Sequence, residues 1–174
     1  PDGQAPAQQV VLRASLDAAN EAMKKLRSSR RQEGLQLQKD IQIRISSTKR
    51  IVRRIHELHN NYTPSRFKKL RENAEQFAAN IDVDPIRLAQ EVAYIASKAD
   101  CTEEIVRLQT HINRLEKVIK SRKPVGSMLN FILQECHRET NTIGSKTDIP
   151  EAASLVIDLK EEFERIKEQV QNVE

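Results

Sequence analysis

The sequence predicts an all-α protein, in which a long helical arm or hairpin is followed by a compact helical bundle. Glycine occurs only four times in 174 residues, tryptophan is absent, and aromatic residues make up 3% of the chain. Charged residues make up 31%, and the repeating residue types have high helix propensity. No segment shows the sustained apolar and polar alternation that is typical of a half-buried strand. Apolar residues recur instead at helical spacing, so the predicted core is largely aliphatic.

The first part of the chain predicts a long helical arm. Helical patterning begins near Ala7 and continues to about Ser28, and the polar run 28–31 is either a break or a solvated turn. From Gln32 to about Asn60 we expect a single long helix, which would span about 40 Å. Its apolar stripe consists of Leu37, Ile41, Ile45, Thr48, Val52 and Ile55.

Two X-Pro pairs predict the next helix starts. Threonine and aspartate are good N-caps, and proline is tolerated at the first helical position. Thr63-Pro64 therefore predicts a short basic helix that ends near Ala79. Asp84-Pro85 predicts in the same way a helix that ends near Lys98.

Three more helices are expected in the second half. The first begins with a capping box at residues 100–103, the second opens at Gly126 or Ser127 after a connector over residues 121–125, and the third starts within residues 148–151. We expect the second of these to stop at Gly144, as a glycine C-cap. The apolar stripe of the first helix consists of Ile105, Leu108, Ile112, Leu115 and Ile119. That of the third consists of Ala152, Leu155, Leu159, Phe163, Ile166 and Val170. The predicted domains are a basic long-helix arm, residues 1–80, and a helical bundle with acidic and histidine residues, residues 81–174.

Charge divides the chain unevenly. Residues 1–71 hold 16 Lys and Arg against 6 Asp and Glu, a net charge of +10, whereas residues 72–174 hold 13 against 19, a net charge of −6. The first half is therefore suited to a polyanion such as RNA. Two cysteines without CxxC spacing, no signal peptide and no apolar run of about 20 residues predict a soluble, cytoplasmic protein without a membrane segment. We expect Cys101 and Cys136 to be packed side chains and not nucleophiles.

A basic cluster with nearby aromatic residues is the first candidate binding surface. Cationic donors suit phosphates, and an aromatic ring such as that of Tyr62 or Phe67 can stack on an unpaired base. A solvated helix face or an acidic protein partner would explain the same pattern. The predicted phosphate-binding residues of this cluster are Lys49, Arg50, Arg53, Arg54, Arg66, Lys68 and Lys69.

Acidic and histidine residues form the second candidate cluster. Glu104, Arg107 and His111 share one helical face, Glu103 lies at its edge, and Glu91 lies on the preceding helix. Such side chains can hold Mg²⁺ or Mn²⁺, or the histidine can act as a general acid or base. Surface salt bridges, for example between Glu104 and Arg107, are the simpler alternative. The other nearby histidines, at positions 56 and 59, are expected on the surface without a ligand role.

Residues 134–146 carry the densest set of polar groups. In a helix, Glu135 and Glu139 lie one turn apart on one face, and Gln134, Arg138 and Asn141 lie on a neighbouring face. The expected turn that follows carries Ser145 and Lys146. This combination favours metal or phosphate chemistry, and the alternative is a solvated face.

Several of these motifs together resemble the YicC/YloC family of bacterial endoribonucleases. The matching positions include Gln90-Glu91-Val92-Ala93, residues 98–100 and 102–104 with Arg107-Leu108 and His111, and Asn141-Thr142-Ile143-Gly144-Ser145-Lys146. The resemblance covers nearly the whole chain. Departures from the family pattern are Ser97, where an acidic residue is frequent, Asn130, where aspartate is usual, and Cys136-His137, where Met-Asn is commoner.

The resemblance implies an RNA endonuclease that is aided by a divalent metal and assembles as a ring-like hexamer. It also implies that the chain is the later part of a longer protein with a β-containing N-terminal domain. Other RNA-decay proteins are possible partners, and no organic cofactor is expected. Water attack and attack by the ribose 2′-hydroxyl both remain open as the cleavage chemistry.

Two functional hypotheses follow from the residues and the resemblance together. The first is a metal-dependent endoribonuclease, and the second is a non-catalytic oligomeric adaptor that presents RNA to another ribonuclease. In the first, Mn²⁺ or Mg²⁺ would be held by Glu91, Asp100, Glu103, Glu104, His111, Glu135 and Glu139. The candidate catalytic residues are His111, Glu104, Glu135, Glu139 and Arg138, and Arg107, Asn141 and Lys146 join the RNA-binding set. Asp100 has an equally good explanation as a helix cap, and Gln134 and Asn141 can position the carboxylates.

Overall fold

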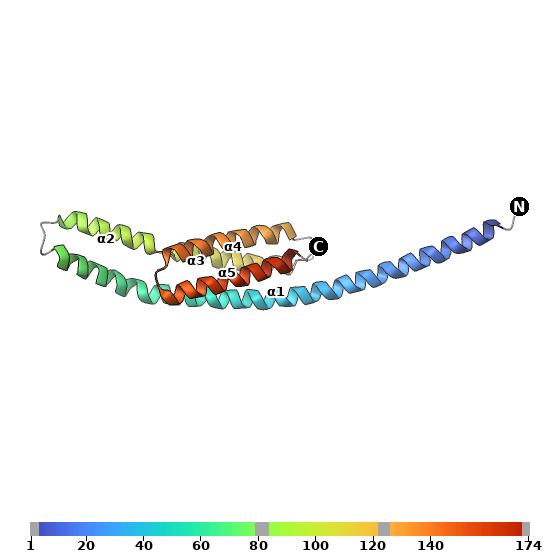
Figure 1. The fold of residues 1–174 in the computed structure, drawn as a ribbon, viewed down its shortest axis with the longest axis horizontal. Helices are drawn as coiled ribbons and strands as arrows, with labels where there is room; N and C mark the ends of the chain where they lie inside the picture. Colours follow the sequence, from blue (N-terminus) through green and yellow to red (C-terminus); the bar gives the residue numbers. More distant parts are fainter. Residues whose placement is uncertain (1–3, 79–83, 122–125, 172–174) are drawn as a thin grey trace. The chain divides into compact units, whose positions relative to one another are not determined.

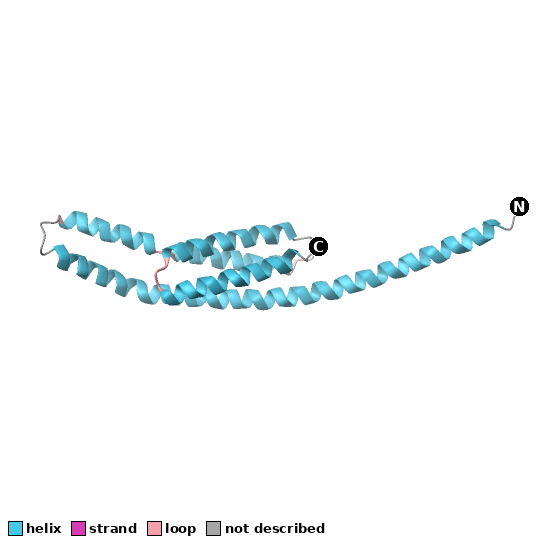
Figure 2. Ribbon diagram, viewed as in Figure 1, coloured by secondary structure: helices cyan, strands magenta, loops and turns pink. Residues whose placement is uncertain are grey.

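The computed structural model describes residues 4–78, 84–121 and 126–171, and every element in them is helical (Figure 2). The all-α prediction is therefore confirmed. None of the described helices combines the length and the hydrophobicity that are needed to cross a membrane. The helices are α1 (Gln4–Ala78), α2 (Pro85–Ala99), α3 (Thr102–Ile119), α4 (Gly126–Lys146) and α5 (Pro150–Gln171).

The chain forms two compact units, residues 1–40 and 41–174, and α1 contributes to both. In the first unit, the apolar side chains at helical spacing are exposed, including Val11, Leu16 and Met23. In the second unit, α1 continues with a stripe that is buried. The candidate site lies entirely in this second unit.

The core of the second unit brings the predicted stripes together. Figure 1 shows α3, α4 and α5 alongside the middle of α1, and α2 alongside the C-terminal end of α1. Ile41, Ile45, Val52 and Ile55 of α1 share one hydrophobic cluster with the stripes of α3, α4 and α5. Every stripe residue predicted for α3 is buried, and Phe163 of α5 is fully buried. The aliphatic core and its helical spacing are thus confirmed.

The prediction that a helix starts at Thr63-Pro64 is wrong, because α1 continues through Pro64. Proline removes one i→i−4 hydrogen bond inside a helix, here the one that would reach the carbonyl of Asn60, and hydroxyl side chains add hydrogen bonds to two neighbouring carbonyls. The hydroxyl of Thr63 donates to the carbonyl of His59 at 2.5 Å, and the hydroxyl of Ser65 donates to the carbonyl of Tyr62 at 3.1 Å. The polar run 28–31 lies inside α1 as well, and the expected helix end at Ala79 lies outside the described residues.

The N-terminal caps of α2 and α3 agree in part with those predicted from the sequence. The Asp84 carboxylate accepts the Ile86 backbone N–H at 2.9 Å, so the predicted start of α2 is confirmed. At α3, Asp100 accepts the Thr102 backbone N–H at 2.9 Å, but Cys101 occupies the N-cap position. Glu103 pairs with an arginine one turn later in place of closing a capping box. The start of α4 at Gly126 is as predicted, whereas connector residues 122–125 lie outside the described part.

Gly144 does not end α4, so the predicted C-cap is wrong. The helix runs on to Lys146, and none of the described glycines has a positive φ. A Cβ at Gly144 would lie 3.0 Å from Cγ1 of Val156 on α5. The glycine therefore permits the close approach of α4 and α5, and the expected turn at Ser145 and Lys146 is the last turn of α4.

Candidate functional site

The candidate site is a polar seam where α3 lies against α4. On α3, burial of Ile105, Leu108 and Ile112 leaves the positions at 104, 107 and 111 on the neighbouring face, beside α4. On α4, burial of Cys136 and Ile143 places positions 135 and 139 at the matching edge. The packing of two apolar stripes therefore aligns two polar edges from distant parts of the sequence.

His111, Glu135 and Glu139 meet at this seam. One ligand atom from each residue, an imidazole nitrogen or a carboxylate oxygen, lies within 4.8 Å of the other two. Glu139 is 5% exposed, and His111 and Glu135 are half-buried. Nη1 of Arg107 lies 3.8 Å from Oε1 of Glu139, and Nη1 of Arg138 lies 4.0 Å from Oε2 of Glu135. The cluster is thus a histidine with two carboxylates, flanked by two guanidinium groups.

Glu104 and Lys146 close the seam at one end. The Lys146 ammonium donates to Oε1 of Glu104 at 2.7 Å and to the backbone carbonyl of Asp100 at 2.9 Å. Burial is the largest single effect on Glu104 and opposes its ionisation, but the hydrogen bond from Lys146, a backbone hydrogen bond and the charges of Lys146 and Arg107 together outweigh it and lower the pKa of that carboxyl. Oε2 of Glu104 is buried and has no hydrogen-bond partner among the described residues. Lys146 therefore ties the last turn of α4 to the first turn of α3.

The other predicted metal ligands do not join the cluster. Asp100 accepts hydrogen bonds at the start of α3, and hydrogen bonding from Thr102 lowers its pKa. Glu103 pairs with Arg107 and holds the pKa of that guanidinium above its ordinary value. Glu91 is exposed on α2. Of the seven predicted ligands, the structure brings three within coordination reach of one another.

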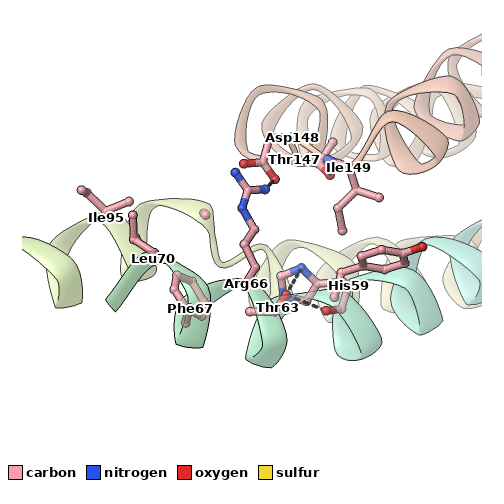
Figure 3. A pocket seen from close by; sticks show the side chains of 11 residues that line it. His59, Thr63, Arg66, Phe67, Leu70, Ile95, Thr147, Asp148 and Ile149 are labelled. Atoms are coloured by element: carbon pink, nitrogen blue, oxygen red, sulfur yellow. Dashed lines mark hydrogen bonds and ion pairs between the residues drawn. The ribbon is translucent and has the colours of Figure 1, made fainter. Parts of the chain in front are cut away.

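His59 is buried, so its expected surface position is wrong. It is 7% exposed, with Nε2 3.2 Å from Oδ1 of Asp100 and Nδ1 3.5 Å from Sγ of Cys101. Figure 3 shows it beside a cavity of about 120 Å³, across which Arg66 reaches Asp148 in an ion pair. The signal that sequence reasoning missed is the spacing from Val52 and Ile55, which extends the buried stripe of α1 to position 59.

The two cysteines are packed side chains, as predicted. Both are buried and free. Burial raises the pKa of the Cys101 thiol to about 11 and that of the Cys136 thiol to about 12. Neither thiol is a thiolate at neutral pH, so neither has the protonation state of a nucleophile.

Several residues of the predicted basic surface already have acidic partners within the chain. Lys49 pairs with Glu116 of α3 at 2.7 Å, and this hydrogen bond lowers the pKa of Glu116. Arg54 pairs with Glu151 of α5 at 2.7 Å. These cations hold α1 against α3 and α5. Among the described residues, Arg50, Arg53 and Lys69 are the exposed members of the predicted set without an ion pair, whereas Arg66 pairs with Asp148 and Lys68 with Glu72.

Comparison with known proteins agrees with the resemblance in the sequence. The family model "Endoribonuclease YicC-like, C-terminal" matches residues 51–174. A protein of Clostridioides difficile (strain 630) named "Probable endoribonuclease YicC" is 38% identical over 158 residues, which are 90% of this chain and 54% of that protein. A protein of the same name from Haemophilus influenzae is 36% identical over 96 residues, 55% of this chain and 33% of that relative. The chain spans about half the length of the first relative and a third of the second. The chain therefore belongs to the YicC-like endoribonuclease family, within the part that the family model describes as C-terminal.

Proposed function

We propose that this protein is an endoribonuclease that cleaves RNA with the help of a divalent metal at the seam between α3 and α4. The observation that carries the proposal is the meeting of His111, Glu135 and Glu139, whose ligand atoms lie within 4.8 Å of one another. The family name supplies the substrate class, because the matching relatives are named probable endoribonucleases. The geometry supplies a place for the chemistry.

The three residues of this cluster fit a divalent cation. Carboxylate oxygens with an imidazole suit Mn²⁺, and carboxylates suit Mg²⁺. Glu139 is nearly fully buried, and a buried carboxylate is costly unless a cation accompanies it. Arg107 approaches it only to 3.8 Å, which leaves room for a closer partner. A cation held by these side chains would act as a Lewis acid toward a phosphoryl oxygen.

The surrounding side chains have separate tasks in this proposal. Arg107 lies near Glu139 and Arg138 near Glu135, and both guanidinium groups stabilise the negative charge that develops on the scissile phosphate. His111 either binds the cation or transfers a proton, and its half-buried position permits both. Lys146 holds Glu104 in place and thereby fixes the end of the seam.

RNA reaches this seam in the proposal through phosphate contacts with the unpaired cations of α1. Arg50 and Arg53 are exposed and lack an ion pair among the described residues, and Lys69 lies further along the same helix. Guanidinium groups bind phosphate oxygens without regard to base sequence. The surface therefore supplies affinity, and the seam supplies catalysis.

The test is cleavage of labelled RNA with Mn²⁺, with Mg²⁺ and with EDTA, together with a binding assay on the same RNA. Glu135→Gln should abolish cleavage and preserve binding, because it removes a charge at the cluster and keeps the side-chain volume. Glu91→Gln is the matched control, since Glu91 is exposed on α2, lies outside the cluster and does not pair with Arg107. Binding without cleavage by the unmodified protein, in each metal, would favour the adaptor and refute the nuclease.

The ends of the products decide the chemistry. Attack by the 2′-hydroxyl leaves a 2′,3′-cyclic phosphate, whereas attack by water leaves a 5′-phosphate or a 3′-phosphate with no cyclic intermediate. A 5′-phosphate would exclude the first route. A cyclic end would favour His111 as a proton-transfer residue, because that route needs a base at the 2′-hydroxyl.

A further inference from the structure

A polar groove lies between α4 and α5, whose helices run side by side in Figure 1. Its wall on α4 carries three carboxamides, from Asn130, Gln134 and Asn141. Within the described part of the chain, none of these side chains makes a hydrogen bond, in contrast to the charged residues of the seam. Each carboxamide therefore presents two N–H donors and one carbonyl acceptor to the groove.

The charges of the groove largely cancel. Nζ of Lys167 lies 3.3 Å from Oε2 of Glu164, so these two residues of α5 form a pair. Burial lowers the pKa of His137, which favours the neutral imidazole, and Nε2 of His137 lies 3.2 Å from Oε1 of Glu164. Arg138 is the remaining cation of the lining, and it reaches back toward Glu135. A phosphate site would need several cations, so the lining suits a neutral group with hydrogen-bonding edges.

The register of α4 places this groove next to the metal-binding cluster. Successive residues turn by about 100° around a helix, so Glu135 and Glu139 face α3 while Gln134 and Asn141 face the groove. Between them runs a ridge that carries Phe131, 53% exposed, and Arg138. One helix width therefore separates a phosphate at the cluster from a group in the groove.

We propose that the groove between α4 and α5 is a nucleobase subsite, which binds the base of an unpaired RNA nucleotide next to the scissile phosphate. Gln134 and Asn141 hydrogen-bond to the edge of the base, and Phe131 on the ridge stacks against a neighbouring base. Proteins recognise single-stranded RNA by this combination of edge contacts and aromatic stacking. The assignment rests on the proposed function for its phosphate site, but base binding is measurable without cleavage.

Binding of two labelled oligoribonucleotides tests the subsite. One is single-stranded RNA, and the other has the same length and sugar-phosphate backbone but lacks the bases. Fluorescence anisotropy in EDTA measures affinity while metal-dependent cleavage is blocked. The unmodified protein should bind the RNA more tightly than the abasic chain, by at least about fivefold.

The variant Gln134→Ala/Asn141→Ala should lose about fivefold or more in affinity for RNA, and its affinity for the abasic chain should not change. Phe131→Ala should also lower the affinity for RNA and leave the affinity for the abasic chain unchanged, because stacking needs a base. Asn113→Ala removes an exposed carboxamide from α3 outside the groove and should change neither affinity. Helicity by circular dichroism checks that each variant remains folded.

Two results would overturn the nucleobase subsite: RNA affinity that is unchanged in the double variant, or an equal loss of affinity for RNA and for the abasic chain. Failure of the proposed function has a different signature. If the protein does not cleave RNA in any metal but the double variant loses affinity only for RNA with bases, the subsite holds and the nuclease proposal fails.

Discussion

Removing the buried carboxylate Glu139 tests the metal site without relying on catalysis. In the variant Glu139→Gln, the side chain keeps its volume but loses its charge. The carboxylates of Glu135 and Glu139 lie within 4.8 Å of each other. At an effective dielectric constant near 20, two unit charges at that separation repel each other by about 3.5 kcal/mol. Arg107, 3.8 Å from Glu139, offsets part of this repulsion.

The sign of the stability change therefore depends on the metal. In EDTA, Glu139→Gln should be as stable as the unmodified protein or more so, because it relieves the repulsion. With Mn²⁺ at 100 times its dissociation constant, the unmodified protein should gain about 2.7 kcal/mol from binding. For a chain of this size, that gain corresponds to a rise in Tm of roughly 5–10 °C. Glu139→Gln should show little or none of this rise.

The measurement is thermal unfolding, followed by circular dichroism at 222 nm, in EDTA and across a Mn²⁺ titration. Glu91→Gln serves as the control, since Glu91 is an exposed carboxylate on α2 outside the cluster, and it should keep the full rise in Tm. An equal Mn²⁺-dependent rise in both variants would refute the reasoning. It would place the bound metal elsewhere and leave the seam as a set of salt bridges.

Three further predictions concern packing, RNA binding and pH. Gly144→Ala should lower the free energy of unfolding by about 1 kcal/mol, because the overpacking of the new Cβ against Val156 at 3.0 Å costs more than the helix propensity that alanine gains. In urea denaturation the loss should shrink when Val156→Ala is also present, and equal losses in both backgrounds would contradict this contact. Arg50→Gln with Arg53→Gln should weaken RNA binding and reduce the slope of log affinity against log salt by about 2, and an unchanged slope would remove them from the interface. Because the pKa of Glu104 is lowered in the folded state, its contribution is present above the ordinary carboxyl pKa and is lost as pH falls through the folded value. The destabilisation by Glu104→Gln at pH 7 should therefore diminish on acidification, and a pH-independent difference would oppose this explanation.

The helices and their buried faces could be predicted from the sequence because burial follows helical spacing. The stripe from Ile105 to Ile119 is buried as expected, and so is the stripe from Ile41 to Ile55. Each stripe needs only local periodicity to be recognised. Spacing alone could not predict which helix each stripe packs against, because that depends on the loops and on the other helices.

The predicted helix boundaries were wrong where one residue type is compatible with two structural roles. Pro64 can start a helix or lie inside one, and hydroxyls of Thr63 and Ser65 add hydrogen bonds to the carbonyls of His59 and Tyr62 beside it. Gly144 can cap a helix or admit a close neighbour, and Val156 supplies that neighbour. In both cases the local sequence is compatible with either outcome, and at Gly144 the contact with α5 decides between them.

Charged residues were the hardest to assign, because the sequence shows each charge without its partner. Lys49 and Arg54 have the spacing of an RNA-binding face, yet their partners Glu116 and Glu151 lie 67 and 97 residues away along the chain. Phosphate contacts at these cations would have to replace existing ion pairs, whereas Arg50 needs no such exchange. The same logic applies to polar groups without charge. The carboxamides of the α4–α5 groove lack partners within the described chain, so a ligand that binds them gains hydrogen bonds without breaking any in the protein. Whether a side chain already has a partner within the protein, more than its residue type, therefore separates the side chains that stabilise this fold from those that can bind RNA.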